Sequence, residues 1–317
     1  MKRLGCASFM SMPAFASRLS AAIQTSDTVL CVGLDPHPDL MPNAFGGPNQ
    51  AAGTKEALCH LRNFCLCIIA AAKDRVPAIK PQAALFEAHG AGGMAVLAEI
   101  AEKARGTGLL VIMDAKRGDI GSTARAYAAA WLGSEAAFTS DALTINPYLG
   151  MDSLEPFFAQ AAATKSGLFV LVRTSNKGST DIQQQNLAEG GGAKIPLYKH
   201  LAHLLSPYID AAIDTETDLS NIGIVVGATG PSEAQELRKL LPSALFLIPG
   251  YGAQGASAAD ACSGLIQKTD GRLTGGLVNA SRVITHNVGV QEATSPEAAR
   301  QAMIEAIDIS KQELVQN

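Results

Sequence analysis

The 317-residue sequence has few aromatic residues, few charged residues and no long apolar run. Aromatic residues make up 5% of it and charged residues 17%, and the formal net charge is −4 with a pI near 5.9. Such a chain lacks the basic surface that binds nucleic acid or an anionic membrane. No stretch has the apolar length of a signal peptide core or a membrane span. We therefore expect a small-molecule partner, with no nucleic acid and no membrane.

The cysteines and histidines show no spacing typical of a metal site or of a disulfide framework. The six cysteines form no C-x-x-C pair and lie mostly in apolar stretches, which favours buried, reduced thiols and a cytoplasmic location. The six histidines are scattered, and the nearest pair, His200 and His203, has no adjacent carboxylate. The sequence therefore predicts no metal ligands.

What the sequence does contain is 30 glycines and a series of short apolar runs separated by helix-like stretches. The runs cover residues 28–34, 76–79, 109–113, 142–145, 168–172, 222–226, 244–248 and 276–279. Eight strands that alternate with helices predict an α/β fold of the (β/α)8 TIM-barrel type. We expect one barrel domain over residues 13–317, after a loose N-terminal extension over residues 1–12. Residues 176–193 are the least regular part and predict a mobile loop that could act as a lid.

The third run ends in alternating acidic and basic residues, at Asp114, Lys116, Arg117 and Asp119. In α/β folds, ligands bind at the carboxyl ends of the strands. Side chains two residues apart in a strand point the same way, so Asp114 and Lys116 are expected to share one pocket while Arg117 points elsewhere. Gly118 allows a sharp turn that takes Asp119 off this line. The simpler alternative is an ion pair at a strand end with no chemical role.

A second candidate site follows the seventh and eighth runs, where barrels commonly bind phosphate. Gly252 and Gly255 lie in the loop after the seventh run, and Ser281 and Arg282 follow the eighth. Glycines allow the backbone to approach a phosphate closely, and a guanidinium can donate two hydrogen bonds to its oxygens. Alternatively, these glycines only form turns and Arg282 lies on the surface.

Taken together, these segments closely resemble the orotidine 5′-phosphate decarboxylase family, which catalyses the last step of UMP biosynthesis. The resemblance rests on Asp114-Ala115-Lys116-Arg117-Gly118-Asp119-Ile120-Gly121, Leu34-Asp35-Pro36, Ile79-Lys80-Pro81, Pro249-Gly250-Tyr251-Gly252-Ala253-Gln254-Gly255 and Arg282. Residues 173–176 and 226–229 look like the longer, bacterial-type branch. The resemblance extends from about residue 26 to residue 290 and implies a TIM barrel that decarboxylates orotidine 5′-phosphate to UMP and CO2 without a cofactor or metal.

The resemblance also implies a role for each matching residue. The catalytic array would consist of Lys80, Asp114, Lys116 and Asp119. Substrate would be bound by Asp35, Thr123, Ser175, Gln254 and Arg282, with Gly252, Gly255 and Ser281 in the phosphate loop. Asp119 and Thr123 would reach the active site of a partner subunit, which implies a homodimer with shared active sites.

Other functions stay open at this point. A Schiff-base aldolase or another sugar-phosphate barrel enzyme would also place a lysine at a strand end, but neighbouring carboxylates would hinder such a lysine by keeping it protonated. A protein that only binds phosphate would leave the four charges unexplained, because buried charges are costly unless they are paired or used. Asp35 could also be a simple turn residue before Pro36, and Ser175 a helix cap.

Overall fold

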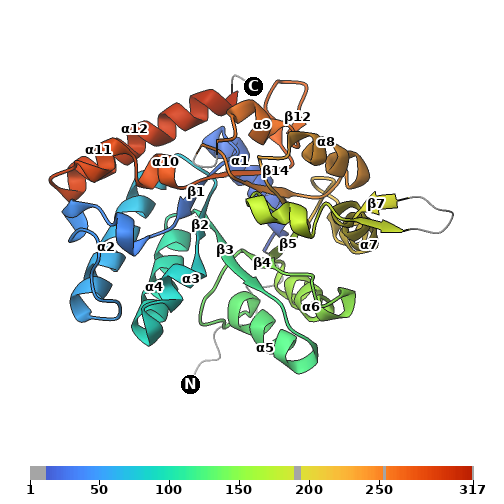
Figure 1. Ribbon diagram of the computed structural model, residues 1–317, viewed down its shortest axis with the longest axis horizontal. Coiled ribbons are helices and arrows are strands. Elements are labelled where there is room, and N and C mark those ends of the chain that lie inside the picture. The colour runs from blue at the N-terminus through green and yellow to red at the C-terminus, as the bar shows by residue number, and fades with distance from the viewer. Residues whose placement is uncertain (1–11, 189–193, 253–254, 316–317) are drawn as a thin grey trace.

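Eight parallel strands close into a barrel in the computed structural model, which describes residues 12–188, 194–252 and 255–315 (Figure 1). The barrel strands are β1 (Leu30–Leu34), β2 (Ala78–Pro81), β3 (Leu110–Arg117), β4 (Ala142–Ile145), β5 (Gly167–Arg173), β10 (Ile222–Val226), β11 (Phe246–Pro249) and β14 (Gly276–Ala280). They follow one another around the barrel in this order, and β14 pairs with β1. The predicted (β/α)8 barrel is confirmed, and each predicted run overlaps one of these strands, although four of the runs begin one or two residues before the strand does.

Helices surround the barrel (Figure 1). They are α1 (Phe15–Ser26), α2 (Lys55–Ala72), α3 (Ala83–Glu87), α4 (Gly90–Gly106), α5 (Gly121–Leu132), α6 (Glu155–Thr164), α7 (Leu197–Ala211), α8 (Pro231–Leu240), α9 (Ala258–Cys262), α10 (Arg282–Thr285), α11 (Val288–Gln291) and α12 (Pro296–Val315). Short 3-10 helices lie at Pro38–Leu40, Asn43–Phe45, Met151–Ser153 and Lys177–Asp181. Among the described residues, no helix has the length and apolar character needed to cross a membrane.

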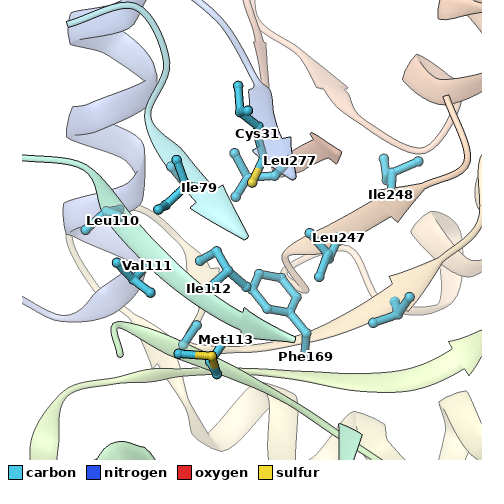
Figure 2. Close-up of a cluster of buried hydrophobic side chains, with 14 of the residues drawn as sticks. Cys31, Ile79, Leu110, Val111, Ile112, Met113, Phe169, Leu247, Ile248 and Leu277 are labelled. Atoms are coloured by element: carbon cyan, nitrogen blue, oxygen red, sulfur yellow. The ribbon is translucent and has the colours of Figure 1, made fainter. Parts of the chain in front are cut away.

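The interior of the barrel is filled with apolar side chains. Figure 2 shows Ile79, Ile112, Phe169 and Leu247 gathered from four different strands, and all four are buried. The Phe169 ring fits because its partner on β10 is Gly223: a Cβ at residue 223 would lie 2.9 Å from the ring and 2.3 Å from the carbonyl oxygen of Leu245. The close packing of the core around Phe169 therefore requires glycine at residue 223.

Helix α1 covers the amino-terminal end of the barrel. Phe15 lies against Gly167, the first residue of β5, and its ring meets Phe169 edge to face at 6.1 Å. Arg18 pairs with the buried carboxylate of Asp141, which also accepts a hydrogen bond of 2.9 Å from the backbone of Val111. Helix α1 thus packs over this end of the barrel, and in barrels of this type the active site lies at the opposite end, where the strands finish.

The segment after β5 is more regular than the sequence indicates. A 3-10 helix at Lys177–Asp181 is followed by a hairpin of β6 (Asn186–Ala188) and β7 (Lys194–Pro196). Arg173 donates a hydrogen bond of 2.6 Å to the Ser179 hydroxyl, which ties the segment to the end of β5. Residues 189–193 of the predicted mobile loop lie outside the described residues, and a role as a lid stays a prediction. Two further small hairpins join β8 (Ile213–Asp214) to β9 (Leu219–Ser220) and β12 (Ile266–Gln267) to β13 (Leu273–Thr274).

The chain beyond residue 290 belongs to the helical layer. Helix α12 buries Ala299, Met303, Ile307 and Leu314 and packs against α2. Residues 1–11 of the predicted N-terminal extension lie outside the described residues. The five described cysteines are free thiols: Cys31, Cys65 and Cys262 are buried as predicted, Cys67 is partly buried and Cys59 is exposed.

The packing at Gly223 predicts a steric effect on stability. Gly223→Ala places a methyl group against the Leu245 carbonyl and the Phe169 ring, so we expect a loss of about 1–3 kcal/mol in the free energy of unfolding, measured by urea denaturation. Gly106→Ala is the control, because no atom lies within 4 Å of a Cβ at this position at the end of α4. It should keep or slightly raise stability. Equal stability of Gly223→Ala and wild type would contradict this account of the core.

Candidate active site

A carboxylate held between two ammonium groups lies at the carboxyl ends of β2 and β3. Lys80 Nζ of β2 lies 2.7 Å from Asp114 Oδ2, and Lys116 Nζ lies 2.7 Å from Asp114 Oδ1. Asp114 and Lys116 therefore share one site, as the two-residue spacing predicts. Arg117 points elsewhere, also as predicted: it pairs with Glu87, and its guanidinium lies 5.4 Å from the centre of the Trp131 ring.

The strand carrying Asp114 and Lys116 does not end where its apolar run ends. Strand β3 continues to Arg117, and its pairing with β4 changes register: Met113 faces Leu143, whereas Arg117 faces Ile145. Residues 114–116 thus bulge opposite a single residue of β4. Lys116 takes a left-handed conformation with φ +50° within this bulge, and that conformation is uncommon outside glycine. The backbone at the carboxyl end of β3 therefore departs from regular strand geometry at the residues that carry the charges.

Two further side chains donate to the same carboxylate. Thr144 Oγ1 lies 2.9 Å from Asp114 Oδ1, and Gln82 Nε2 lies 3.2 Å from Asp114 Oδ2. Sequence reasoning gave neither residue a role. The available signals were weak: Gln82 lies two residues after Lys80, just beyond the end of β2, and Thr144 is the one polar residue in an apolar run.

The electrostatic interactions within the cluster determine the ionisation states of Asp114 and Lys80. Burial by itself raises the pKa of Asp114, but the charges of Lys80 and Lys116 and their hydrogen bonds outweigh it, and the pKa lies well below its usual range. Burial likewise lowers the pKa of Lys80, but the charges of Asp114 and Asp35 outweigh that effect and leave the pKa above its usual value. At neutral pH, Asp114 is therefore an anion and Lys80 a cation.

Exposure distinguishes the two lysines. The side chain of Lys80 is 5% exposed, and that of Lys116 is 45% exposed. Lys80 is thus a buried counter-ion beneath Asp114, whereas the Lys116 ammonium can reach a ligand above it. The sequence does not reveal this difference in exposure, because Lys80 and Lys116 each simply follow an apolar run in it.

Asp35 follows the end of β1, beside the end of β14. A Cβ at Gly33 would collide with Ser281 Oγ at 1.8 Å and lie 3.3 Å from Asp35 Oδ2, so Gly33 is what lets Ser281 pack against β1. Asp35 Oδ1 is buried and has no hydrogen-bond partner among the described residues. A buried carboxylate oxygen without a donor is costly, so its position suits a hydroxyl or amide donated by a ligand.

The predicted phosphate loop lies beside α10. Pro249 and Asn279 are paired at the ends of β11 and β14, which places the loops after these strands side by side. Gly252, with φ +72°, packs against Val283, since a Cβ there would lie 2.5 Å from Val283 Cγ1. The structure thus brings the glycine loop next to Ser281 and the exposed Arg282. Gly255 closes the turn with a hydrogen bond of 3.0 Å to the Gly252 carbonyl, and Gln254 lies outside the described residues.

The other predicted residues stand apart from the Asp114 cluster within this chain. Asp119 accepts a hydrogen bond of 2.8 Å from the Ile120 backbone, and Thr123 is exposed in the first turn of α5. In the described part of the chain, neither forms a hydrogen bond or an ion pair with Lys80, Asp114 or Lys116. Ser175 lies at the end of β5, where it packs closely against Gly227 and its carbonyl accepts a hydrogen bond of 3.3 Å from Thr229.

Sequence comparisons agree with these observations. The family model described as "Orotidine 5'-phosphate decarboxylase / HUMPS family" matches residues 28–296. The orotidine 5′-phosphate decarboxylase of Rhodopirellula baltica is 40% identical over 305 residues, which cover 93% of this chain and 98% of the relative. That of Roseiflexus castenholzii is 39% identical over 298 residues, covering 93% of this chain and 97% of the relative.

Solved structures show the same fold. A crystal structure from Streptomyces avermitilis has a TM-score of 0.76 at 34% identity, over 98% of this chain and 99% of that one. The OMP decarboxylase of Leishmania donovani has a TM-score of 0.68 at 31% identity, over 94% of this chain and 99% of that one. By the extent of the family match and the identity to full-length relatives, this chain belongs to the orotidine 5′-phosphate decarboxylase / HUMPS family.

Proposed function

We propose that this protein decarboxylates orotidine 5′-phosphate to UMP and CO2, the final step of UMP biosynthesis. The observation that carries the proposal is the ionised Asp114 held between Lys80 and the accessible Lys116 at the open end of the barrel. The names of the relatives at about 40% identity support the same reaction. The proposed site residues are those that the sequence predicts.

In the proposed reaction, the bond between C6 of the pyrimidine and its carboxylate breaks. CO2 leaves, the electron pair stays on C6, and the Lys116 ammonium first stabilises this carbanion and then donates a proton to it. A cation that is already in place lowers the barrier most in a site from which water is excluded. Asp114 holds the ammonium at 2.7 Å and places a like charge near the departing carboxylate, which favours its loss.

The remaining residues are proposed to bind the rest of the substrate. Asp35 accepts hydrogen bonds from ribose hydroxyls, which its unpartnered Oδ1 supports. Arg282, with the glycine loop and Ser281, binds the 5′-phosphate. Ser175 contacts the pyrimidine edge, and Gln254 bridges towards the phosphate. Binding energy gathered at the phosphate can then hold the reacting carbon against Lys116.

The geometry favours this reaction over a Schiff-base mechanism. A lysine nucleophile must lose its proton, yet Lys116 donates to a carboxylate whose pKa is held well below its usual range. Reduction with borohydride in the presence of a carbonyl substrate distinguishes the two: a covalent adduct on Lys116 is expected only for the aldolase-type mechanism. The side chains supply the charges that the reaction needs, so the proposal includes no cofactor.

The proposal includes a homodimer with shared active sites. Three large apolar side chains are exposed at the open end of the barrel: Ile120 (58%), Tyr148 (81%) and Leu149 (51%). Their loops lie together, because Gly118 packs against the Asn146 carbonyl. A second copy covering this face would bury the apolar side chains and bring Asp119 and Thr123, which flank Ile120, towards the partner's site. The free thiols of the five described cysteines support the cytoplasm as the location.

Removal of the proposed proton donor tests the function first. Lys116→Ala should lower kcat/KM for orotidine 5′-phosphate by at least about 10³-fold, because it removes both the cation and the proton. Binding of UMP and the unfolding transition should change little. Lys103→Ala, at an exposed position on α4, is the control for loss of a lysine. Turnover by Lys116→Ala within about tenfold of wild type, a barrier change near 1.4 kcal/mol, would rule out the assignment.

Removal of the proposed phosphate ligand tests the binding model. Arg282→Ala should weaken UMP binding and lower kcat/KM for the nucleotide by about 10- to 100-fold, since a charge-assisted pair of hydrogen bonds is lost. The exposed Arg300 on α12 provides the matched control, Arg300→Ala. Binding of the phosphate-free nucleoside should not change. A loss for the nucleoside as large as that for the nucleotide would show that Arg282 does not bind the phosphate.

Subunit mixing tests the shared site. In a symmetric dimer, each site takes Lys116 from one chain and Asp119 from the other, so a heterodimer of Lys116→Ala and Asp119→Ala has one intact site. Random exchange makes about half of the dimers mixed, and activity should recover to roughly a quarter of wild type. Mixing Lys116→Ala with Asp114→Asn should give no recovery, because both residues serve the same site. If tagged chains co-purify but neither mixture gains activity, Asp119 acts within its own chain.

A further inference from the structure

The buried hydroxyl of Thr144 links the backbone of Lys116 to the carboxylate that holds its side chain. The Lys116 N–H donates to Thr144 Oγ1 at 3.0 Å, and Thr144 Oγ1 donates to Asp114 Oδ1 at 2.9 Å. Lys116 Nζ donates to the same oxygen at 2.7 Å. The three residues therefore form a closed ring of hydrogen bonds around the proposed proton donor.

The ring lies where the barrel sheet is irregular. Residues 114–116 of β3 face Thr144 alone on β4, so the regular ladder of backbone hydrogen bonds is interrupted there. The Thr144 hydroxyl accepts the Lys116 N–H that the ladder would otherwise satisfy. It does so while Lys116 holds a left-handed φ of +50°, which needs support from its surroundings.

Thr144 is too deeply buried for contact with solvent to explain a polar residue here. It is 1% exposed and lies between the buried Leu143 and Ile145. A hydroxyl has one proton and accepts through its lone pairs, and here the proton goes to Asp114 while a lone pair takes the Lys116 N–H. A valine has nearly the same shape but can make neither bond.

We propose that Thr144 is a positioning residue for the decarboxylation: its hydroxyl fixes the Lys116 backbone and Asp114 relative to each other, and so aims the ammonium at C6. The inference rests on the proposed function. Because a displacement of a catalytic group by about 1 Å can cost about 100-fold in rate, loss of the hydroxyl should lower kcat by about 10- to 100-fold. KM should change less than threefold, because Thr144 does not line the phosphate loop.

Three variants test the proposal. Thr144→Val removes the hydroxyl and should lose kcat as stated, whereas Thr144→Ser keeps it and should stay within about threefold of wild type. Thr164→Val is the matched control: Thr164 is also buried and its hydroxyl also makes two hydrogen bonds, to the Gln160 carbonyl and to Ser166, on the outer helix α6. It should cost stability and leave kcat unchanged. Full activity of Thr144→Val, or an equal loss in Thr144→Ser, would overturn the proposal.

Two further measurements keep the test decisive. If Thr144→Val does not fold, Thr144→Ala is compared with Thr144→Ser. The proposal then requires kcat of the alanine variant to be at least about tenfold lower than kcat of the serine variant. A crystal structure of the valine or alanine variant should show Lys116 displaced from Asp114 Oδ1 or out of its left-handed conformation; an unchanged Lys116 would contradict the proposal whatever the activity. If wild type itself fails to convert orotidine 5′-phosphate, the proposed function fails, while this structural result still tests the role of Thr144.

Discussion

The structure of the site depends on one buried carboxylate. Burial alone raises the pKa of Asp114 and so disfavours its ionised form. Lys80, Lys116, Thr144 and Gln82 supply four donors to its two oxygens. The charges and hydrogen bonds of the two lysines outweigh burial and hold the pKa of Asp114 well below its usual range. Removing one partner leaves a buried charge uncompensated, and this lowers the free energy of unfolding by far more than the intact pair contributes to it. The stability of each of these charged residues therefore depends on the others.

The barrel supplies what this unit needs. Lys80, Asp114 and Thr144 come from three consecutive strands, so their side chains meet at one end of a rigid sheet. The bulge in β3 and the left-handed Lys116 then turn one ammonium outwards while the other stays buried. An exposed cation that is held by a fixed anion has little freedom to reorganise, which is the condition for electrostatic catalysis.

Much of this arrangement follows from the sequence, because periodicity and strand ends are local signals. The eight apolar runs locate the eight strands, and the two-residue spacing brings Asp114 and Lys116 together. The bulge was not predictable, since it depends on the register between β3 and β4, and the extension of β3 through Lys116 follows from it. Thr144 and Gln82 were missed for a similar reason: their roles come from contacts between strands. The exposure that separates Lys80 from Lys116 is likewise a tertiary property.

The central claim is that side-chain charges alone carry the decarboxylation. It is tested most directly by incubating wild-type protein, treated with a metal chelator, with orotidine 5′-phosphate in D2O and following the products by NMR. The account predicts release of CO2 and formation of UMP with deuterium at C6, because the Lys116 ammonium exchanges its protons with solvent before it donates one. Unchanged substrate, or activity that returns only when a metal is added back, would contradict it.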